Sequence, residues 1–175
     1  MSDEKKQAER EQVFVAVKMQ YGFVPNVIRE LAVSPAAARV YIEGQRIMAG
    51  AALTAREQQA VSLAVSRHNG CAYCRAAHRA GGRHAGLSEA DIAAIDSGGI
   101  PGDASIAGVV AAARRVLSAR GWLAAADLSR FEALGMDRAR LYEIVALIGL
   151  KTITNYVNHI AHTEIDAPLR DAAAE

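Results

Sequence analysis

The sequence is divided into short segments of helical apolar spacing by residues that begin or end helices. Thr54-Ala55-Arg56-Glu57 has the form of a capping box, in which the threonine and glutamate side chains satisfy free backbone N–H groups. A helix is therefore predicted to begin at Thr54 and to end at Asn69-Gly70, a pair that readily leaves the right-handed region. Runs of alternating apolar and polar residues are hard to find, and aromatic residues, which favour strands, are only 5% of the chain. The pattern predicts an all-α protein.

Other caps and breakers predict the remaining helices. Pro35 can occupy the first turn of a helix that runs toward Met48. Ser88 and Asp103 are candidate caps of two further helices. Asp137 is expected to cap the longest helix, which we predict to be the main strut of the core. Its apolar residues include Leu141, Ile144, Val145, Ile148, Ile153 and Val157.

The chain length fits one domain with its own core, because about 150 residues per domain is usual. We expect a single helical domain over residues 1–175, with flexible ends at residues 1–10 and 167–175. Gly81-Gly82-Arg83 is predicted to be a linker that leaves His84 exposed.

Charge and hydropathy exclude several classes of protein. The formal net charge is +1, so no strong field would gather nucleic acid or anionic lipid. Residues 1–10 are highly charged and lack the apolar core of a secretion signal, and no apolar run approaches the roughly 18 residues of a membrane helix. We therefore expect a cytoplasmic protein that binds neither nucleic acid nor a membrane.

The chain has two cysteines, three positions apart in Cys71-Ala72-Tyr73-Cys74. A disulfide that closes so short a loop removes little chain entropy, so its structural value is small. In a reducing cytosol this spacing is typical of redox chemistry or metal binding. Cys71, Cys74 and His78 stand at i, i+3 and i+7, which places all three on one side of a predicted helix.

Each thiol has a source of activation. Cys71 lies near a helix start, where free N–H groups and the positive end of the dipole favour a thiolate, and Cys74 is four residues from His78. One thiolate can attack a peroxide oxygen or an oxidised sulfur, after which the second thiol closes the disulfide. His78, with an unperturbed pKa of about 6.5, is expected to remove and return protons near neutral pH.

Non-redox alternatives remain open for the cysteine pair. It can be two small, buried, inert thiols, or a structural zinc site built from Cys71, Cys74, His78 and His68. A single helix rarely wraps a metal tetrahedrally, and the chain has no second cysteine pair, so we expect no metal and no cofactor. A further alternative is a non-enzymatic oligomer that senses redox state.

Two stretches extend this pattern beyond the dithiol. They are Leu53–Ser66 with Asn69–Cys74 and Ala77-His78, and Asn155-Tyr156 with Asn158–Ala161 and Thr163–Asp166. Together they resemble the carboxymuconolactone decarboxylase superfamily, and specifically its AhpD-like alkylhydroperoxidase branch. The resemblance implies a helical bundle assembled into a trimer or hexamer. It also implies thiol-based reduction of organic hydroperoxides, with electrons from a lipoylated or thioredoxin-like protein.

The resemblance also assigns roles to individual residues. In the family the second cysteine attacks the peroxide, which implies attack by Cys74 and resolution by Cys71, whereas the helix start favours a thiolate on Cys71. The family has a glutamate twelve residues before the first cysteine, where this chain has Gln59. Glutamine can position a water or orient His78, but it does not accept a proton. The alternative activity is decarboxylation of a lactone acid, although members with that chemistry typically lack the cysteine pair.

Three more side chains are candidates for supporting roles. His68, three positions before Cys71, is either a second base or a solvated loop residue. Tyr73 can lend its hydroxyl to a peroxide or simply pack as an aromatic. Glu57 is a carboxylate close to Gln59, but two residues differ by about 200° on a helix, so capping explains it better.

Overall fold

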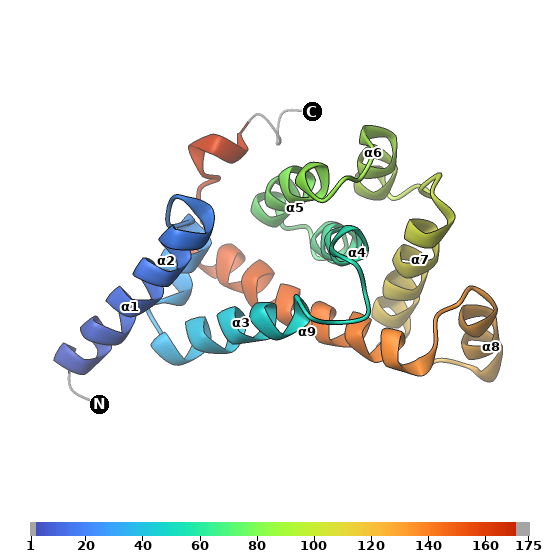
Figure 1. Ribbon diagram of the computed structural model, residues 1–175, viewed down its shortest axis with the longest axis horizontal. Helices are drawn as coiled ribbons and strands as arrows, with labels where there is room; N and C mark the ends of the chain where they lie inside the picture. The colour runs from blue at the N-terminus through green and yellow to red at the C-terminus, as the bar shows by residue number, and fades with distance from the viewer. Residues whose placement is uncertain (1–2, 171–175) are drawn as a thin grey trace.

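Helices account for most of the chain in the computed structural model, which describes residues 3–170 (Figure 1). The elements are α1 (Asp3–Tyr21), α2 (Asn26–Leu31), α3 (Pro35–Met48), α4 (Ala55–His68), α5 (Ala72–His84), α6 (Glu89–Ser97), α7 (Ala104–Ala119), α8 (Ala125–Ala133), α9 (Arg138–Ala161) and the 3-10 turn η1 (Ala167–Leu169). The described residues contain no strand, which confirms the all-α prediction.

Caps predicted from the sequence begin several of these helices. At α4, Thr54 Oγ1 accepts a hydrogen bond from the Glu57 N–H (3.3 Å), and the Glu57 carboxylate accepts one from the Thr54 N–H (2.8 Å). Asp103 accepts from two backbone N–H groups at the start of α7, and Asp137 accepts from one at the start of α9. These side chains fix the helix starts because they satisfy donors that have no partner within the helix.

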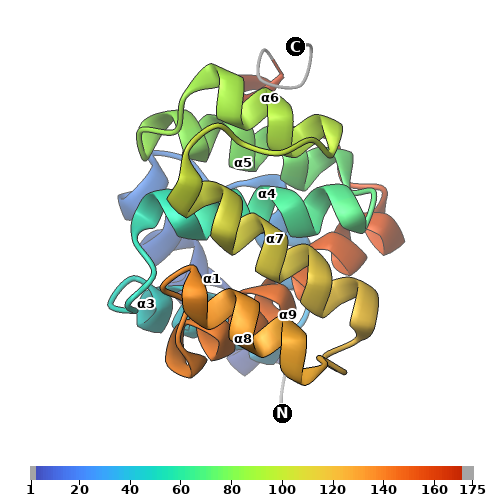
Figure 2. The same cartoon turned by 90° about the vertical axis from the view of Figure 1, so that its right-hand side faces the viewer.

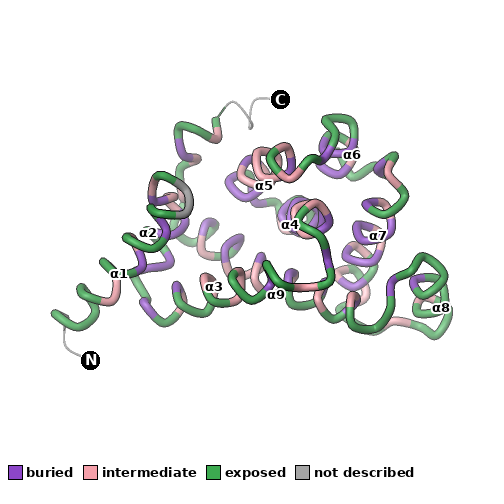
Figure 3. Tube along the Cα trace, in the orientation of Figure 1, coloured by how far each residue is buried: buried purple, intermediate pink, exposed green. Residues whose placement is uncertain are grey.

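Helix α4 lies at the centre of the molecule, with α5, α7 and α9 packed around it (Figures 1 and 2). Residues 60–66 of α4 are all buried, as the burial colouring of the central helix also shows (Figure 3). The predicted strut α9 also contacts α2, α3 and α5, but the buried central helix is α4. Helix α9 buries Leu141 and Ile144 on one face and leaves Tyr142 and Val145 exposed on the other, so it covers the core from one side.

The first half of α9 belongs to one apolar cluster and the second half to another. The first cluster joins α4, α6, α7 and the residues around Ile144. The second joins α1, α2 and α3 with Ile153 and Val157 of α9, and it includes Cys71 and Cys74. The start of α5 therefore carries the dithiol into a mostly apolar environment.

The segment Gly81-Gly82-Arg83 is not the linker that the sequence predicts, because α5 continues through it and ends at the exposed His84. Its glycines serve close packing instead. A Cβ at Gly81 would stand 2.7 Å from Gln59 Oε1, and one at Gly82 would stand 2.9 Å from Leu87 Cδ1. Only a residue without a side chain allows α5 to approach these neighbours so closely.

The flexibility predicted for the two ends stays a prediction, and the structure gives only their backbone conformation. Residues 3–10 form the first turns of α1, and residues 167–169 form η1, while residues 1–2 and 171–175 lie outside the described part of the chain. Within the described part, no helix is both long and apolar enough to cross a membrane.

Candidate active site

A left-handed turn joins α4 to α5 and places Cys71 at the start of α5. Gly70 has a φ of 71°, and the Cys71 N–H donates to the Ser66 carbonyl at 2.9 Å, which closes the end of α4. Asn155 of α9 supports the turn, since its Oδ1 accepts from Asn69 Nδ2 at 2.8 Å. Cys71 is the N-cap residue of α5, so its sulfur lies beside the free N–H groups of the first turn.

The two thiols lie together and share a donor. Both cysteines are free, and their exposed fractions are 1% for Cys71 and 4% for Cys74. Asn158 Nδ2 donates to both sulfurs, at 3.2 Å from Cys74 Sγ and 3.8 Å from Cys71 Sγ. Cys74 Sγ also lies 3.8 Å from Thr154 Oγ1. The structure therefore brings the sulfurs to one side of α5, against α9.

The reduced pair ionises unevenly. Hydrogen bonds from the Cys74 thiol and backbone N–H and from Asn158 lower the pKa of Cys71 to about 6, in spite of burial. The pKa of Cys74 is raised, because its thiol donates to Cys71 and burial disfavours a second charge. The negative charge therefore resides on Cys71, as its place at the helix start predicts. This ionisation does not favour Cys74 as the first nucleophile.

His78 and Gln59 are hydrogen-bonded partners, with Nδ1 of the imidazole 2.9 Å from Oε1 of the amide. An amide oxygen only accepts, so this contact assigns the proton to Nδ1 and leaves the lone pair on Nε2. Burial and, secondarily, the positive charge of Lys151 hold the pKa of His78 well below its usual range. The expectation of a histidine that titrates near neutral pH is therefore wrong, and the imidazole is neutral there.

His78 makes no hydrogen bond to either sulfur within the described residues. A proton that moves between Cys74 and Nε2 must therefore pass through a water or the substrate. All three residues lie on α5, but the thiols contact α9 whereas the imidazole contacts Gln59 of α4, so their grouping into one reacting set stays a prediction.

Four buried polar residues of α9 complete the site, and of these only Asn155 and Asn158 belong to the segments that carry the family resemblance. Lys151, Thr154, Asn155 and Asn158 stand at i, i+3, i+4 and i+7, and each has an exposed fraction of 4% or less. A polar stripe at helical spacing within an otherwise apolar helix was the available sign of a site. Their partners lie on other helices, far away in the sequence.

Tyr73 ties two segments of the chain together. Its hydroxyl donates to the carboxylate of Asp166 and accepts a hydrogen bond from the Val27 N–H at 3.4 Å. The same carboxylate accepts from the Asn26 N–H at 3.1 Å. Burial and the bond to Asp166 raise the pKa of Tyr73, so the phenol is neutral. Of the two predicted roles, packing fits Tyr73.

Glu57 and His68 also lie outside the reacting group. The Glu57 carboxylate caps α4 and accepts hydrogen bonds from Ser105 Oγ (2.7 Å) and Arg140 Nη2 (2.6 Å). These bonds lower the pKa of Glu57, although its burial opposes them. His68 is exposed at the end of α4, as a solvated residue would be, and makes no hydrogen bond to the dithiol within residues 3–170.

The zinc alternative has no cluster to support it. Among the described residues, no three His, Cys, Asp or Glu side chains gather closely enough to hold a metal ion. His78 Nδ1 is engaged by Gln59, and the nearest polar groups to the Cys74 sulfur are the Asn158 amide and the Thr154 hydroxyl.

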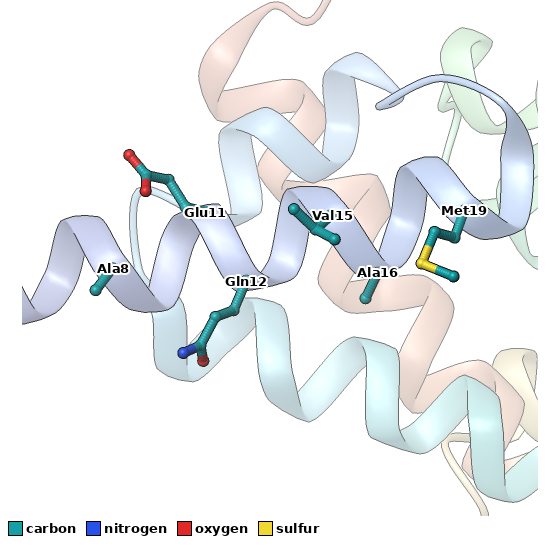
Figure 4. Close-up of a pocket in the computed structure, with 6 residues that line it drawn as sticks. All are labelled: Ala8, Glu11, Gln12, Val15, Ala16 and Met19. Carbon is teal, nitrogen blue, oxygen red and sulfur yellow. The ribbon is translucent and has the colours of Figure 1, made fainter.

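Two hollows on the surface lie on other parts of the molecule. One runs along α1 and is lined by Ala8, Glu11, Gln12, Val15, Ala16 and Met19 (Figure 4). The other lies between α5 and α6, and its lining includes four arginines together with Asp96 and Glu89. Neither lining includes a cysteine or histidine, so neither hollow contains the dithiol.

The fold and the dithiol define a class of helical proteins, and comparison with known families identifies it. The model of the carboxymuconolactone decarboxylase family matches residues 35–125, which is just over half of the chain. The protein belongs to this family. No curated protein matches the sequence.

Solved structures share the fold over nearly the whole chain. The alkylhydroperoxidase AhpD core, an uncharacterized peroxidase-related protein from Ralstonia eutropha JMP134, has a TM-score of 0.82 and 21% identity, covering 93% of this chain and 87% of that chain. A peroxidase-related protein from Silicibacter sp. TM1040 has a TM-score of 0.80 with the same identity and coverage. The debrominase Bmp8 has a TM-score of 0.75 and 18% identity, covering 99% of this chain and 94% of its own. At these identities the likeness establishes an AhpD-like fold.

Proposed function

We propose that this protein is a thiol-dependent oxidoreductase that reduces organic hydroperoxides through Cys71 and Cys74. The observation that carries the proposal is the pair of adjacent thiols with the pKa of Cys71 lowered to about 6. A thiolate at neutral pH with a second thiol in contact is what a two-cysteine peroxidase cycle requires. The neutral His78 supplies a proton acceptor on the same helix.

In the proposed cycle, the Cys71 thiolate attacks the terminal oxygen of the hydroperoxide. The O–O bond breaks, and Cys71 becomes a sulfenic acid. The leaving alkoxide takes the proton of the Cys74 thiol and becomes an alcohol, which leaves Cys74 as a thiolate. The Cys74 thiolate then attacks the Cys71 sulfur, forms the disulfide and expels hydroxide, which becomes water by taking a proton that His78 relays through a bound water. The two thiols are oxidised by two electrons, and the peroxide bond is reduced.

The burial of the sulfurs constrains both substrate and reductant. With 1% and 4% of the two cysteines exposed, only a slender group reaches them. A lipoyl group on a flexible arm fits this restriction better than the broad surface of a thioredoxin-like protein. We propose a lipoylated protein as the electron donor, and a homotrimer or homohexamer as the working assembly.

The test is a stoichiometric reaction of the reduced protein with cumene hydroperoxide, followed by thiol counting and quantification of cumyl alcohol. The proposal predicts the loss of two thiols for each alcohol formed. No thiol loss within minutes would contradict peroxidase function. Turnover of a lactone acid without thiol loss would favour the decarboxylase alternative.

Trapping the sulfenic acid with dimedone distinguishes the two cysteines. Cys74→Ser retains the proposed nucleophile and lacks the resolving thiol, so it should accumulate the dimedone adduct on Cys71. Cys71→Ser should react far more slowly, because the pKa of the remaining Cys74 is not lowered by a helix start. The opposite result would restore the role that the family resemblance implies for Cys74.

A further inference from the structure

Lys151 is a buried cation whose partners carry no negative charge. Its exposed fraction is 1%, and it is the only lysine after Lys18. Its Nζ donates to Tyr41 Oη at 3.0 Å and lies 3.5 Å from Gln45 Oε1 and 5.0 Å from the Tyr41 ring centroid. Within the described residues it forms no ion pair with a carboxylate. An uncompensated buried charge destabilises a fold, so its presence needs a reason.

The position of Lys151 on α9 connects it to the dithiol. It lies one turn before Thr154 and two turns before Asn158, the residues that contact the Cys74 sulfur. Thr154 Oγ1 also donates to the Lys151 carbonyl at 3.0 Å, which fixes this turn of the stripe. In the proposed cycle Cys74 becomes a thiolate beside this face of α9. We infer that the Lys151 ammonium is the counter-charge of the Cys74 thiolate, and that it serves the step in which Cys74 attacks the oxidised Cys71.

The electrostatics of the neighbouring groups agree with this role. The positive charge of Lys151 acts to lower the pKa of Cys74 and also lowers the pKa of His78. His159, further along α9, acts on Cys71 instead. On α5, His78 and Tyr73 are both neutral, and α4 contributes the uncharged Gln59. Different groups therefore favour the two thiolates, the start of α5 for Cys71 and Lys151 for Cys74, although the net pKa of Cys74 is raised in the reduced pair.

The experiment is a thiolate titration in the Cys71→Ser background, where Cys74 is the remaining thiol, read by ultraviolet absorbance and by the pH dependence of iodoacetamide alkylation. Lys151→Met should raise the pKa of Cys74 by about one unit or more, which is the usual effect of removing a nearby opposite charge. Lys151→Gln removes the charge but keeps a donor for Tyr41, and it should give the same shift. Lys151→Arg should leave the value near that of the parent. Lys18→Met removes an exposed lysine from α1 and is the matched control, with no shift expected.

A second readout is the pKa of His78 by NMR, which should also rise in Lys151→Met because the imidazolium is no longer repelled. Lys151→Met should be at least as stable to heat as the parent, since it removes a buried charge without losing side-chain volume. Unchanged pKa values of both Cys74 and His78 in the neutral variants, or a loss of stability without these shifts, would overturn the inference. The inference takes its reaction step from the proposed function, but the titrations contain no peroxide. If the pKa values of Cys74 and His78 shift as expected but the protein does not reduce peroxides, the proposed peroxidase function is refuted and the role of Lys151 as counter-charge still holds.

Discussion

Replacing Gly81 with alanine should separate catalysis from stability in this protein. The new Cβ would stand 2.7 Å from Gln59 Oε1 and 3.2 Å from Nε2, so the flexible end of Gln59 must move and its hydrogen bond to His78 is lost. Alanine in a helix interior gains about 0.5–1 kcal/mol over glycine, and the lost hydrogen bond costs about 0.5–1.5 kcal/mol. The free energy of unfolding should therefore stay within about 1 kcal/mol of the wild type.

The reaction rate should fall further than the stability. His78 loses the acceptor that fixes its tautomer, and an orienting bond worth about 1.4 kcal/mol corresponds to roughly a tenfold lower rate with cumene hydroperoxide. Gly149→Ala is the matched control, because Gly149 lies in α9 with open space around the new Cβ. It should keep the wild-type rate and raise the melting temperature by about 1–4 °C. A wild-type rate for Gly81→Ala, or a crystal structure of it with Gln59 still bound to His78, would refute the reasoning.

Further predictions test the remaining contacts. Iodoacetamide alkylation of Cys71 should accelerate as the pH rises through about 6 and then level off, because the thiolate forms above its lowered pKa; a midpoint near the ordinary value of about 8.5 would contradict this. Gln59→Glu places a carboxylate on His78 Nδ1, so NMR should show a raised pKa of His78 and the peroxide reaction should accelerate; an unchanged or slower reaction would eliminate the missing carboxylate as the limiting group. Tyr73→Phe leaves the buried Asp166 without its hydroxyl donor and should cost about 1–3 kcal/mol, or about 2–4 °C in melting temperature per kcal/mol; an unchanged melting temperature would show that this bond contributes little.

Local chemistry allowed most of the helices to be predicted from the sequence. The capping box of Thr54 and Glu57 and the caps Asp103 and Asp137 act within one turn, so their effect is visible without knowledge of the tertiary structure. The positions of Cys71, Cys74 and His78 on one helix side follow from the same short-range geometry.

Long-range packing decided what the sequence did not predict. Two adjacent glycines are typical of a linker, yet Gly81 and Gly82 lie inside α5. Their missing side chains leave room for Gln59 and Leu87, which pack closely against this part of the helix. The shared donor Asn158 stands more than 80 positions from the sulfurs that it contacts, and no local pattern specifies such a pairing. The central place of α4 likewise depends on which helices surround it.

The pKa of each ionisable group could not be predicted from the sequence either. The sequence predicts a histidine that titrates near neutral pH, but burial and the charge of Lys151 keep His78 neutral. Desolvation depends on how many atoms surround a group, which is a property of the folded chain. The pKa values of Cys71 and Cys74 also differ because of contacts and burial that only the folded chain provides.

Peptide mapping of the reduced protein after one equivalent of cumene hydroperoxide tests the central claim most directly. The account predicts one product, an intramolecular disulfide between Cys71 and Cys74, with one equivalent of cumyl alcohol and full return of both thiols on treatment with dihydrolipoamide. Two thiols that survive the peroxide unchanged, or oxidation to sulfinic acid without a disulfide, would contradict it.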